Sequence, residues 1–442
     1  MNLAFSLSNQ RDLDSYSIEA IDYKNGKNVI FEKNARKLLN PASLQKILTA
    51  YVALKTLGAN YQFENKLYRS GYITKDHILQ GNVYLYFGAD PDFTGSDIEK
   101  FLIKLKSLKV QTINGDIVID DSRFDEQLYP DGWIIENQRF CFAAPTSPII
   151  INQNCFLVNL SANRENIHLT YNKGIDPRIK NYAKILNHED CYLDLITNES
   201  NEYYLKGCSS VEELPPRLSI AIRNPRIYLE NIIKHYAKKH NLKFKNIIYQ
   251  KLNNKAVLVH SHKSRPLKLL IKPLLKDSNN LIAEIFMKEF ATVYKKNPGS
   301  WREAIKLYKD ILMNDLNLQE NEFNIADGSG LSLKNLISAN TINNLLLHIY
   351  QNEQEIRKLI FDALPQSGKD GTLKDKLNNI NKDYTILAKT GTLDNTSSLS
   401  GYIIQDNNLR YIFSIIINNN LKNKELRFDE EERILQDIIA IK

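Results

Sequence analysis

The clearest hydrophobic pattern in the chain predicts a helix over residues 40–58. Its apolar residues recur three or four positions apart, which places them on one helical face. These residues are Leu44, Ile47, Leu48, Tyr51 and Leu54. Asn40 suits the N-cap, Pro41 suits the first helical position, and Gly58 suits the end of the element. The helix therefore has start and stop signals as well as an apolar face.

Other hydrophobic patterns predict strands at both ends of the chain and helices between them. Two extended runs, 16–21 and 28–31, are joined through Asn25-Gly26, which is a hairpin signal. Three more extended runs cover 384–390, 401–404 and 411–417. Helical spacing recurs over 225–241, 266–316, 339–359 and 424–441. Residues 69–258 otherwise consist of short extended segments and turns. This order predicts an α/β domain interrupted by a β-rich insertion.

Length and composition limit the class of protein. At 442 residues the chain is too long for one ordinary domain, so two or three are expected. Its content of 43% hydrophobic and 25% charged residues is typical of a soluble globular protein. The net charge of +7 comes from scattered lysines, without a basic tail, so we expect no nucleic-acid partner. Residues Met1 to Ser8 lack the features of a secretory signal, which leaves either a cytoplasmic protein or a processed form.

The four cysteines leave two interpretations open. Cys141, Cys155, Cys191 and Cys208 form no C-x-x-C pair, which argues against a zinc site, and they allow three disulfide pairings. Pairing each cysteine with its nearest neighbour would close two short loops between strand-like runs and indicate an oxidising compartment. Four buried free thiols are the alternative.

The first candidate for chemistry is Ser43-Leu44-Gln45-Lys46, at the start of the predicted helix. The spacing places Ser43 and Lys46 on one face, about one turn apart. The unpaired N–H groups and the dipole of a first helical turn favour developing negative charge. A serine hydroxyl becomes a good nucleophile when a base removes its proton, and a lysine with a lowered pKa can do this. Alone the motif is weak, because this spacing also occurs on ordinary helix surfaces.

A second candidate motif, Ser278-Asn279-Asn280, lies between two helical stretches. A loop at this position could direct Ser278 and Asn280 inward. The alternative is an N-cap cluster for the helix that follows.

A third candidate motif, Lys389-Thr390-Gly391-Thr392, ends an extended run. Gly391 would allow a ligand to approach the strand backbone closely. The cation, the hydroxyls and the strand-edge amides could hold a peptide carboxylate and add the peptide as an extra strand. Alone this segment is an ordinary strand-terminal turn. The order S-x-x-K, S-x-N, K-T-G, however, is the motif set of β-lactamases and penicillin-binding proteins.

The spacing of the motifs selects within that superfamily. Ser43 and Ser278 are 235 positions apart (278 − 43), far more than a compact β-lactamase uses. The sequence resembles the class C low-molecular-mass penicillin-binding proteins, which are D-alanyl-D-alanine carboxypeptidase/endopeptidases. The resemblance covers nearly the whole chain. Beyond the three motifs it includes Gly88-Ala89-Asp90-Pro91, Cys141-Phe142-Ala143-Ala144-Pro145, Asn154-Cys155-Phe156, Ala326-Asp327-Gly328-Ser329-Gly330-Leu331-Ser332 and Asp370-Gly371-Thr372-Leu373.

The resemblance implies a fold and a division into domains. A β-lactamase/transpeptidase-like α/β domain, with an antiparallel sheet flanked by helices, would comprise residues 1–68 and 259–442. Two nested β-rich domains would be inserted in it. The first would comprise 69–162 and 217–258, and the second 163–216.

The resemblance also implies roles for the motif residues. Ser43 would be the acylated nucleophile and Lys46 its proton acceptor. Ser278 would relay a proton to the leaving amine, and Asn280 would bind the amide of the acyl group. Lys389 would be the cation of the carboxylate site.

Further roles follow for the rest of the third motif. Thr390 and Thr392, with Lys389, would hold the terminal carboxylate of the substrate, and Gly391 would permit its close approach. The backbone N–H groups of Ser43 and Thr392 would form the oxyanion hole.

Two positions depart from the family pattern. Members that recognise diaminopimelate place an acidic residue shortly before the Asn-Cys-Phe segment, where this chain has the neutral Asn152. Where they have an arginine after the Asp-Gly-Thr-Leu segment, this chain has Lys376, a less rigid anion partner. Asn152 and Lys376 are therefore candidate substrate-binding residues with an altered charge pattern.

The resemblance extends to cofactors, partners and location. The cysteines match the pairs Cys141–Cys155 and Cys191–Cys208 of periplasmic members, so we expect both disulfides and a periplasmic enzyme whose signal peptide is not in this chain. No cofactor or metal is expected. The expected partners are peptidoglycan peptides and β-lactam antibiotics as covalent inhibitors. A homodimer, and the balance between carboxypeptidase and endopeptidase activity, stay open.

Several rival interpretations are weaker. A Ser-His-Asp hydrolase would need a G-x-S-x-G elbow, which the sequence lacks. A β-lactamase would need a placed deacylating base, and a non-catalytic peptidoglycan-binding scaffold would be expected to lose Ser43, Lys46 or Lys389. His260 and His262 alternate at strand spacing and are interpreted as a structural pair. The acidic triplet 429–431 is interpreted as a solvated helix face.

Overall fold

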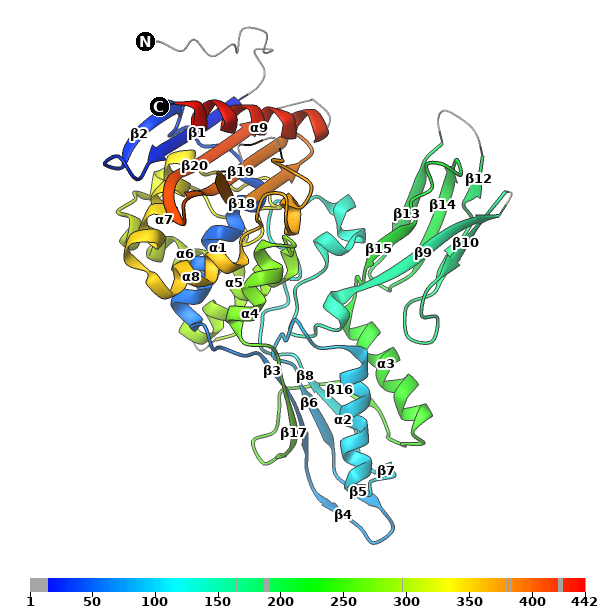
Figure 1. Ribbon diagram of the computed structural model, residues 1–442. Coiled ribbons are helices and arrows are strands. Elements are labelled where there is room, and N and C mark those ends of the chain that lie inside the picture. The colour runs from blue at the N-terminus through cyan, green and yellow to red at the C-terminus, as the bar shows by residue number, and fades with distance from the viewer. Residues whose placement is uncertain are drawn as a thin grey trace.

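The computed structural model describes residues 15–163, 165–186, 191–295, 297–378, 380, 383–419 and 424–441. The N-terminal segment Met1 to Ser8, which bears on the signal peptide, lies outside these residues. The structure has a helix-rich body at one end and two inserted β-rich parts that extend from it (Figure 1).

The body contains a five-stranded antiparallel sheet with the order β18-β19-β20-β1-β2. Its strands are β1 (Ser15–Asp22), β2 (Asn28–Lys33), β18 (Tyr384–Leu393), β19 (Thr396–Gln405) and β20 (Asn408–Asn418). Strand β1 pairs with β20 along its whole length, from Ser15 opposite Asn418 to Asp22 opposite Tyr411. The N-terminal hairpin and the C-terminal strands therefore form one sheet, although most of the chain separates them.

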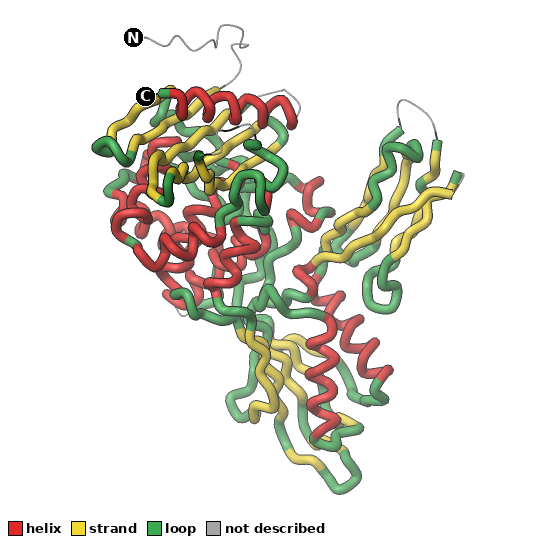
Figure 2. Tube along the Cα trace, viewed as in Figure 1, coloured by secondary structure: helices red, strands yellow, loops and turns green. Residues whose placement is uncertain are grey.

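Helices cover both faces of this sheet (Figure 2). The helix α9 (Lys424–Ala440) packs on one face through Ile434, Leu435 and Ile438. The larger core on the other face contains the remaining helices of the body. These are α1 (Gln45–Leu57), α4 (Leu267–Leu275), α5 (Asn280–Lys295), α6 (Trp301–Leu316), α7 (Ala339–Asn352) and α8 (Gln354–Ala363). The predicted α/β class, with an antiparallel sheet flanked by helices, is confirmed.

The first inserted part is built on a five-stranded sheet with the order β16-β8-β6-β3-β17. Its strands are β3 (Glu64–Arg69), β6 (Val83–Tyr86), β8 (Ile117–Asp120), β16 (Ile247–Tyr249) and β17 (Val257–Lys263). A small sheet adds β4 (Tyr72–Ile73), β5 (Ile78–Gln80) and β7 (Thr112–Ile113). The helices α2 (Gly95–Ser107) and α3 (Pro225–Lys239) pack on this part with their apolar faces inward.

The second inserted part is a seven-stranded sheet that lies inside the first in sequence. Its strands are β9 (Cys155–Asn163), β10 (Asn166–Thr170), β11 (Ile179–Asn181), β12 (Lys184–Ile185), β13 (Leu193–Thr197), β14 (Tyr203–Ser209) and β15 (Arg217–Ala221). We propose domain limits that follow the sheets instead of the expected limits, which cut through strands. Strands β3 and β17 pair with each other and belong to the first inserted part. Strands β9 and β15 pair with each other and belong to the second inserted part.

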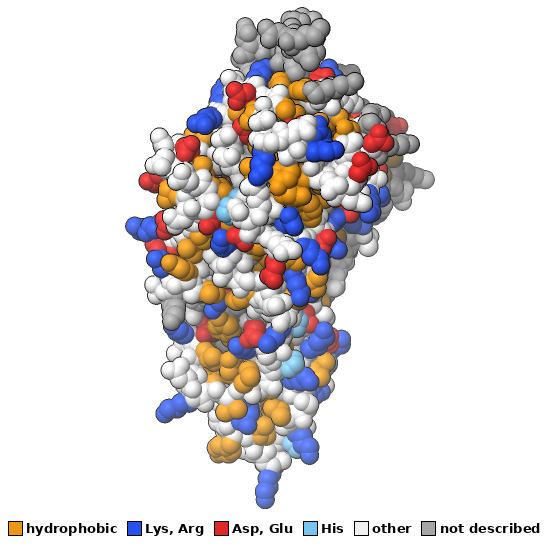
Figure 3. Space-filling view, turned by 60° about the vertical axis from the view of Figure 1, so that its left-hand side comes forward, with side chains coloured by type: hydrophobic (Ala, Val, Ile, Leu, Met, Phe, Trp, Pro, Cys, Tyr) orange, Lys and Arg blue, Asp and Glu red, His pale blue; other side chains and the backbone are white. Residues whose placement is uncertain are grey.

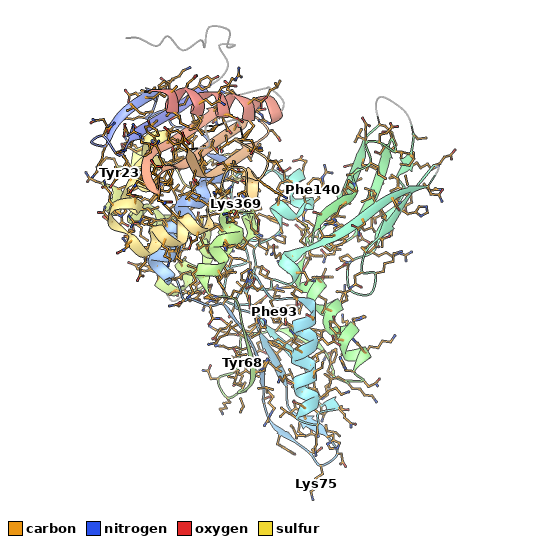
Figure 4. The ribbon with its side chains drawn as sticks, in the orientation of Figure 1. Tyr23, Tyr68, Lys75, Phe93, Phe140 and Lys369 are labelled. Atoms are coloured by element: carbon orange, nitrogen blue, oxygen red, sulfur yellow. A yellow bond between two sulfur atoms is a disulfide. The ribbon has the colours of Figure 1, made fainter. Side chains whose placement is uncertain are left out.

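Specific polar contacts join the first inserted part to the body. The guanidinium of Arg123 pairs with the buried carboxylate of Glu289 on α5, which also accepts a hydrogen bond from Tyr61. Within the first inserted part, the side chain of Phe93, labelled in Figure 4 between the body and α2, packs edge-on against His262 of β17. His262 in turn hydrogen-bonds to the buried Asp90 through Nδ1 at 2.8 Å, consistent with a structural role for this histidine.

The surface in Figure 3 carries basic and acidic side chains interspersed over this face, as the scattered charge of the sequence predicts. Within the described part of the chain, no helix is both long enough and apolar enough to cross a membrane.

Two sequence interpretations need correction. The predicted helix at 40–58 forms, but a 3-10 turn over Ala42–Leu44 precedes α1, because Ala42 has a left-handed φ of 46°. Ser43 therefore lies in that turn and not in the first turn of an α-helix. The acidic triplet on α9 is not a solvated face: Glu430 and Glu431 are only 3% and 1% exposed.

Candidate active site

The first motif places a buried lysine against the candidate nucleophile. Asn40 accepts a hydrogen bond from the N–H of Ala42 through Oδ1 at 2.8 Å, which stabilises the turn that carries Ser43. Lys46, in the first turn of α1, has no exposed surface. Its Nζ lies 2.9 Å from Oγ of Ser43 and 2.6 Å from the carbonyl oxygen of Ser329. The structure therefore brings the two residues of the motif into direct contact.

The environment of Lys46 suits a proton acceptor. Burial lowers the pKa of Lys46 to about 7, because the charged ammonium loses its hydration, while the carboxylates of Asp327 and Glu284 act in the opposite direction. A lysine with this pKa is partly neutral at neutral pH. It can then accept the hydroxyl proton of Ser43.

The third motif passes directly beside Ser43. A Cβ atom on Gly391 would lie 2.9 Å from the backbone nitrogen of Ser43 and 2.9 Å from the carbonyl oxygen of Pro41. Glycine is required here because strand β18 packs closely on the turn that holds the nucleophile. The sequence analysis assigned the close approach to a ligand, whereas the structure places the protein's own backbone there.

Side chains of the third motif differ in exposure. Lys389 is fully buried, donates to the carbonyl oxygen of Thr390 at 2.7 Å, and has a pKa lowered by burial and by the charge of Lys46. The hydroxyl of Thr390 donates to Oγ1 of Thr372 at 2.7 Å. Thr392 is exposed at the end of the motif.

The second motif contains the N-cap of α5. Asn279 caps α5, since its Oδ1 accepts from the N–H of Ile282 at 3.0 Å. Ser278 is half-buried and has a left-handed φ of 57°. Asn280 donates through Nδ2 to the carbonyl oxygen of Phe142 at 2.7 Å, so it joins α5 to the inserted part.

A disulfide supports this contact. Cys141, which precedes Phe142, is bonded to Cys155. The second predicted pair, Cys191–Cys208, also forms. The cysteine pairing predicted from the family resemblance is therefore the one that the structure contains.

The two departures from the family pattern lie in different surroundings. Asn152 accepts from the N–H of Gly95 at 3.2 Å and donates to the hydroxyl of Tyr228 at 3.1 Å. Its neighbour Gln153 accepts from Asn279 of the second motif at 2.8 Å. The ammonium of Lys376, by contrast, lies 3.8 Å from the ring centroid of Phe428 on α9.

The sequence analysis assigned no role to three residues that surround Lys46: Ser329, Glu284 and Asp327. The available signals were the glycine-rich segment at 327–330 and an acidic residue one turn after Asn280. Among the residues that the structure describes, no cluster of three or more His, Cys, Asp or Glu side chains is placed to hold a metal ion.

Comparison with known proteins gives consistent results. Residues 6–435 match the model of the D-Ala-D-Ala carboxypeptidase 3 (S13) family. The chain is 29% identical over 403 residues to D-alanyl-D-alanine carboxypeptidase DacB of Haemophilus influenzae, covering 89% of this chain and 83% of that protein.

Solved structures agree with the sequence comparison. The crystal structure of penicillin binding protein 4 from H. influenzae superposes with a TM-score of 0.88 at 28% identity, covering 98% of each chain. The same protein complexed with a β-lactam superposes with a TM-score of 0.82 at 27% identity, covering 97% of each. These matches cover the body and both inserted parts. The chain belongs to the D-Ala-D-Ala carboxypeptidase 3 (S13) family.

Proposed function

We propose that this protein is a serine D-alanyl-D-alanine carboxypeptidase/endopeptidase that acts on peptidoglycan stem peptides through an acyl-enzyme on Ser43. The observation that carries the proposal is the 2.9 Å contact between Oγ of Ser43 and Nζ of the fully buried Lys46. Membership of the S13 family and similarity to a named D-alanyl-D-alanine carboxypeptidase support the substrate class.

In the first step, Oγ of Ser43 attacks the carbonyl carbon of the penultimate D-alanine while Lys46 accepts the hydroxyl proton. The N–H groups of Ser43 and Thr392 stabilise the oxyanion of the tetrahedral intermediate. The peptide C–N bond then breaks, and the leaving amine takes a proton through Ser278. The charge of Lys389, with the hydroxyls of the third motif, holds the terminal carboxylate.

In the second step, water hydrolyses the ester and releases the shortened peptide. If the leaving amine belongs to a cross-linked neighbouring peptide, the same steps amount to an endopeptidase reaction. A β-lactam would acylate Ser43 in the same way, and its slow hydrolysis would make it an inhibitor. The relative's complex with a β-lactam supports this expectation.

The cellular location follows from the same proposal. The substrate lies outside the cytoplasm, and two disulfides favour an oxidising compartment, so we place the enzyme in the periplasm. A homodimer stays a prediction, which the mass of the protein in solution would test.

The proposal is tested with the purified chain and a Ser43→Ala variant. We expect the wild type to release D-alanine from a D-Ala-D-Ala peptide and to be labelled by penicillin on the peptide containing Ser43, as seen by mass spectrometry. The variant should lose both properties while keeping the far-ultraviolet circular dichroism of the wild type. Labelling at another residue would contradict the proposal. Fast, repeated turnover of a chromogenic β-lactam would identify a β-lactamase instead.

A further inference from the structure

The position of Lys46 depends on a backbone carbonyl from a distant part of the chain. Nζ of Lys46 donates to the carbonyl oxygen of Ser329 at 2.6 Å, a shorter contact than the one it makes with Ser43. A neutral amine has two N–H bonds and one lone pair. When one N–H bond points at Ser329, the rotation of the amine is restricted and its lone pair can face the hydroxyl of Ser43.

The segment that leads to the Ser329 carbonyl is held by Glu284. This carboxylate on α5 accepts the N–H of Gly328 at 3.1 Å and the N–H of Ser329 at 2.8 Å. Its Oε2 also accepts from Nε1 of Trp301 at 2.8 Å. Glu284 has no exposed surface. One buried side chain therefore fixes both peptide groups before the carbonyl that contacts Lys46.

The same loop packs tightly on its surroundings. A Cβ atom on Gly328 would lie 2.7 Å from the carbonyl oxygen of Ala283 on α5. One on Gly330, whose φ is 83°, would lie 1.8 Å from the carbonyl oxygen of Ala42, beside Ser43. The loop thus connects α5, which follows the second motif, to the turn that carries the nucleophile.

Asp327 fixes the other side of the loop. Its Oδ1 accepts from the N–H of Gly330 at 2.7 Å and from Nδ2 of Asn335 at 2.7 Å. Its Oδ2 accepts from the N–H of Ser332 at 2.6 Å and from Nε1 of Trp133 at 2.8 Å. Asp327 therefore holds the peptide group of the Ser329 carbonyl itself, which links Ser329 to Gly330. Glu284 holds the segment immediately before the Ser329 carbonyl.

We propose that Glu284 is a positioning residue for the acylation step: it fixes the two peptide groups that precede the Ser329 carbonyl and so supports the contact of that carbonyl with Lys46, and its negative charge raises the fraction of Lys46 that is protonated. This inference rests on the proposed function, since it concerns the same serine and the same proton transfer. Among the residues that the structure describes, Glu284 accepts hydrogen bonds from Gly328, Ser329 and Trp301 and none from Ser43, so it acts through Ser329 and Lys46.

The charges around the pair determine the direction of the effect. Lys46 faces the carboxylates of Asp327 and Glu284, both of which raise its pKa, and it lies near the ammonium of Lys389. Glu284 is also near Lys288 and the buried hydroxyl of Tyr308. Burial and repulsion from Asp327 raise the pKa of Glu284, whereas the hydrogen bonds from Ser329, Trp301 and Gly328 lower it and favour the carboxylate. Loss of the charge at Glu284 would therefore favour the neutral form of Lys46.

The test compares Glu284→Gln with the wild type in the pH dependence of acylation by a fluorescent penicillin. The amide keeps the shape of the side chain but removes the charge, and its Nε2 would oppose the N–H of Trp301. We expect the acylation rate constant to fall by about 10- to 100-fold, because a small displacement of a catalytic base costs about that much. We expect the midpoint of its acid limb to move down by about one pH unit, because a carboxylate beside the cation is lost.

Two further variants separate positioning from loss of stability. Glu284→Gln combined with Trp301→Phe removes the donor that the new amide would oppose. If the single variant fails to fold, the double variant should fold and should still show the displaced midpoint of the acid limb. Glu289→Gln is the matched control, since Glu289 is a buried carboxylate on the same helix that pairs with Arg123. It should lower thermal stability and leave the midpoint of the acid limb unchanged.

The outcomes distinguish this inference from the proposed function. If wild-type protein is not acylated on Ser43, the proposed function fails. If the wild type is acylated, but both Glu284 variants keep its rate and its midpoint, the role of Glu284 is refuted. A lower rate with an unchanged midpoint in both variants would also refute the electrostatic part of the inference.

Discussion

The buried carboxyl group of Glu431 gives a prediction about stability that can be worked out from the structure. It lies on α9, 1% exposed, where its Oε1 accepts from the hydroxyl of Ser397 at 2.5 Å. Burial raises the pKa of Glu431 from 4.5 to about 8, since the partial compensation from Ser397, Lys376 and Arg427 is smaller than the lost hydration. The perturbation is Glu431→Gln, which resembles the neutral acid in shape and charge.

The sign follows from linkage between protonation and folding. The pKa of Glu431 is higher in the folded state than in the unfolded state, so folding favours the protonated acid. Its stabilising contribution is fully present below pH 4.5 and is lost as the pH rises towards 8. At pH 7, which is 2.5 pH units above the unfolded-state pKa (7 − 4.5), each unit lowers the free energy of unfolding by about 1.36 kcal/mol, so the total loss is about 3 kcal/mol. At pH 5 the same relation gives less than about 1 kcal/mol.

The assay is urea unfolding of wild type and Glu431→Gln at pH 5 and pH 7, followed by circular dichroism. The stability of the variant relative to the wild type should increase by about 2 kcal/mol between the two pH values. Asp429→Asn is the matched control, because Asp429 is an exposed carboxylate on the same helix. If both variants change in parallel with pH, Glu431 is charged in the folded state and the reasoning is refuted.

Three more predictions concern the site and its support. Lys46→Arg should reduce acylation by about 100-fold or more at every pH tested, because a guanidinium cannot be deprotonated in a protein; a fluorescent penicillin measures it, and near-wild-type labelling would contradict the role. Replacing Cys191 and Cys208 by serine should lower the free energy of urea unfolding by about 3 kcal/mol, given their separation of 17 residues. A reductant added to this variant should cause no further loss from this disulfide. Trp133→Phe should cost about 1–3 kcal/mol, because buried Asp327 loses a donor at 2.8 Å, and calorimetry should show it as a lower Tm.

Much of the fold could be predicted from the sequence, because local signals and tertiary packing agree there. The hairpin at the N-terminus, α3, the helices of the body and the three C-terminal strands all follow from apolar spacing and turn residues. The sequence could not reveal that β1 pairs with β20, since that contact joins residues 399 positions apart (Ser17 opposite Ile416, 416 − 17). The order of the elements predicted one interrupted α/β domain, but it did not predict which strands pair.

The burial of acidic side chains on α9 was the main feature that the local sequence pattern predicted wrongly. Three successive acidic residues on an amphipathic helix are normally exposed, and Asp429 is. Glu430 and Glu431 are buried because partners lie on other elements: the hydroxyl of Tyr16 on β1 donates to Glu430 at 2.6 Å, and Ser397 on β19 donates to Glu431. Such partners cannot be identified from the spacing within α9.

The same limit applies to the active site. Spacing along one helix is sufficient to place Lys46 next to Ser43, because a separation of three residues brings two side chains together in any helical turn. It does not explain why this lysine, unlike an ordinary surface lysine, can serve as a base. The burial that lowers the pKa of Lys46 and its carbonyl acceptor on Ser329, 283 positions away, are both tertiary features. A serine and a lysine at this spacing are therefore weak evidence of a catalytic pair by themselves, because the spacing does not reveal how the lysine is buried or which groups surround it.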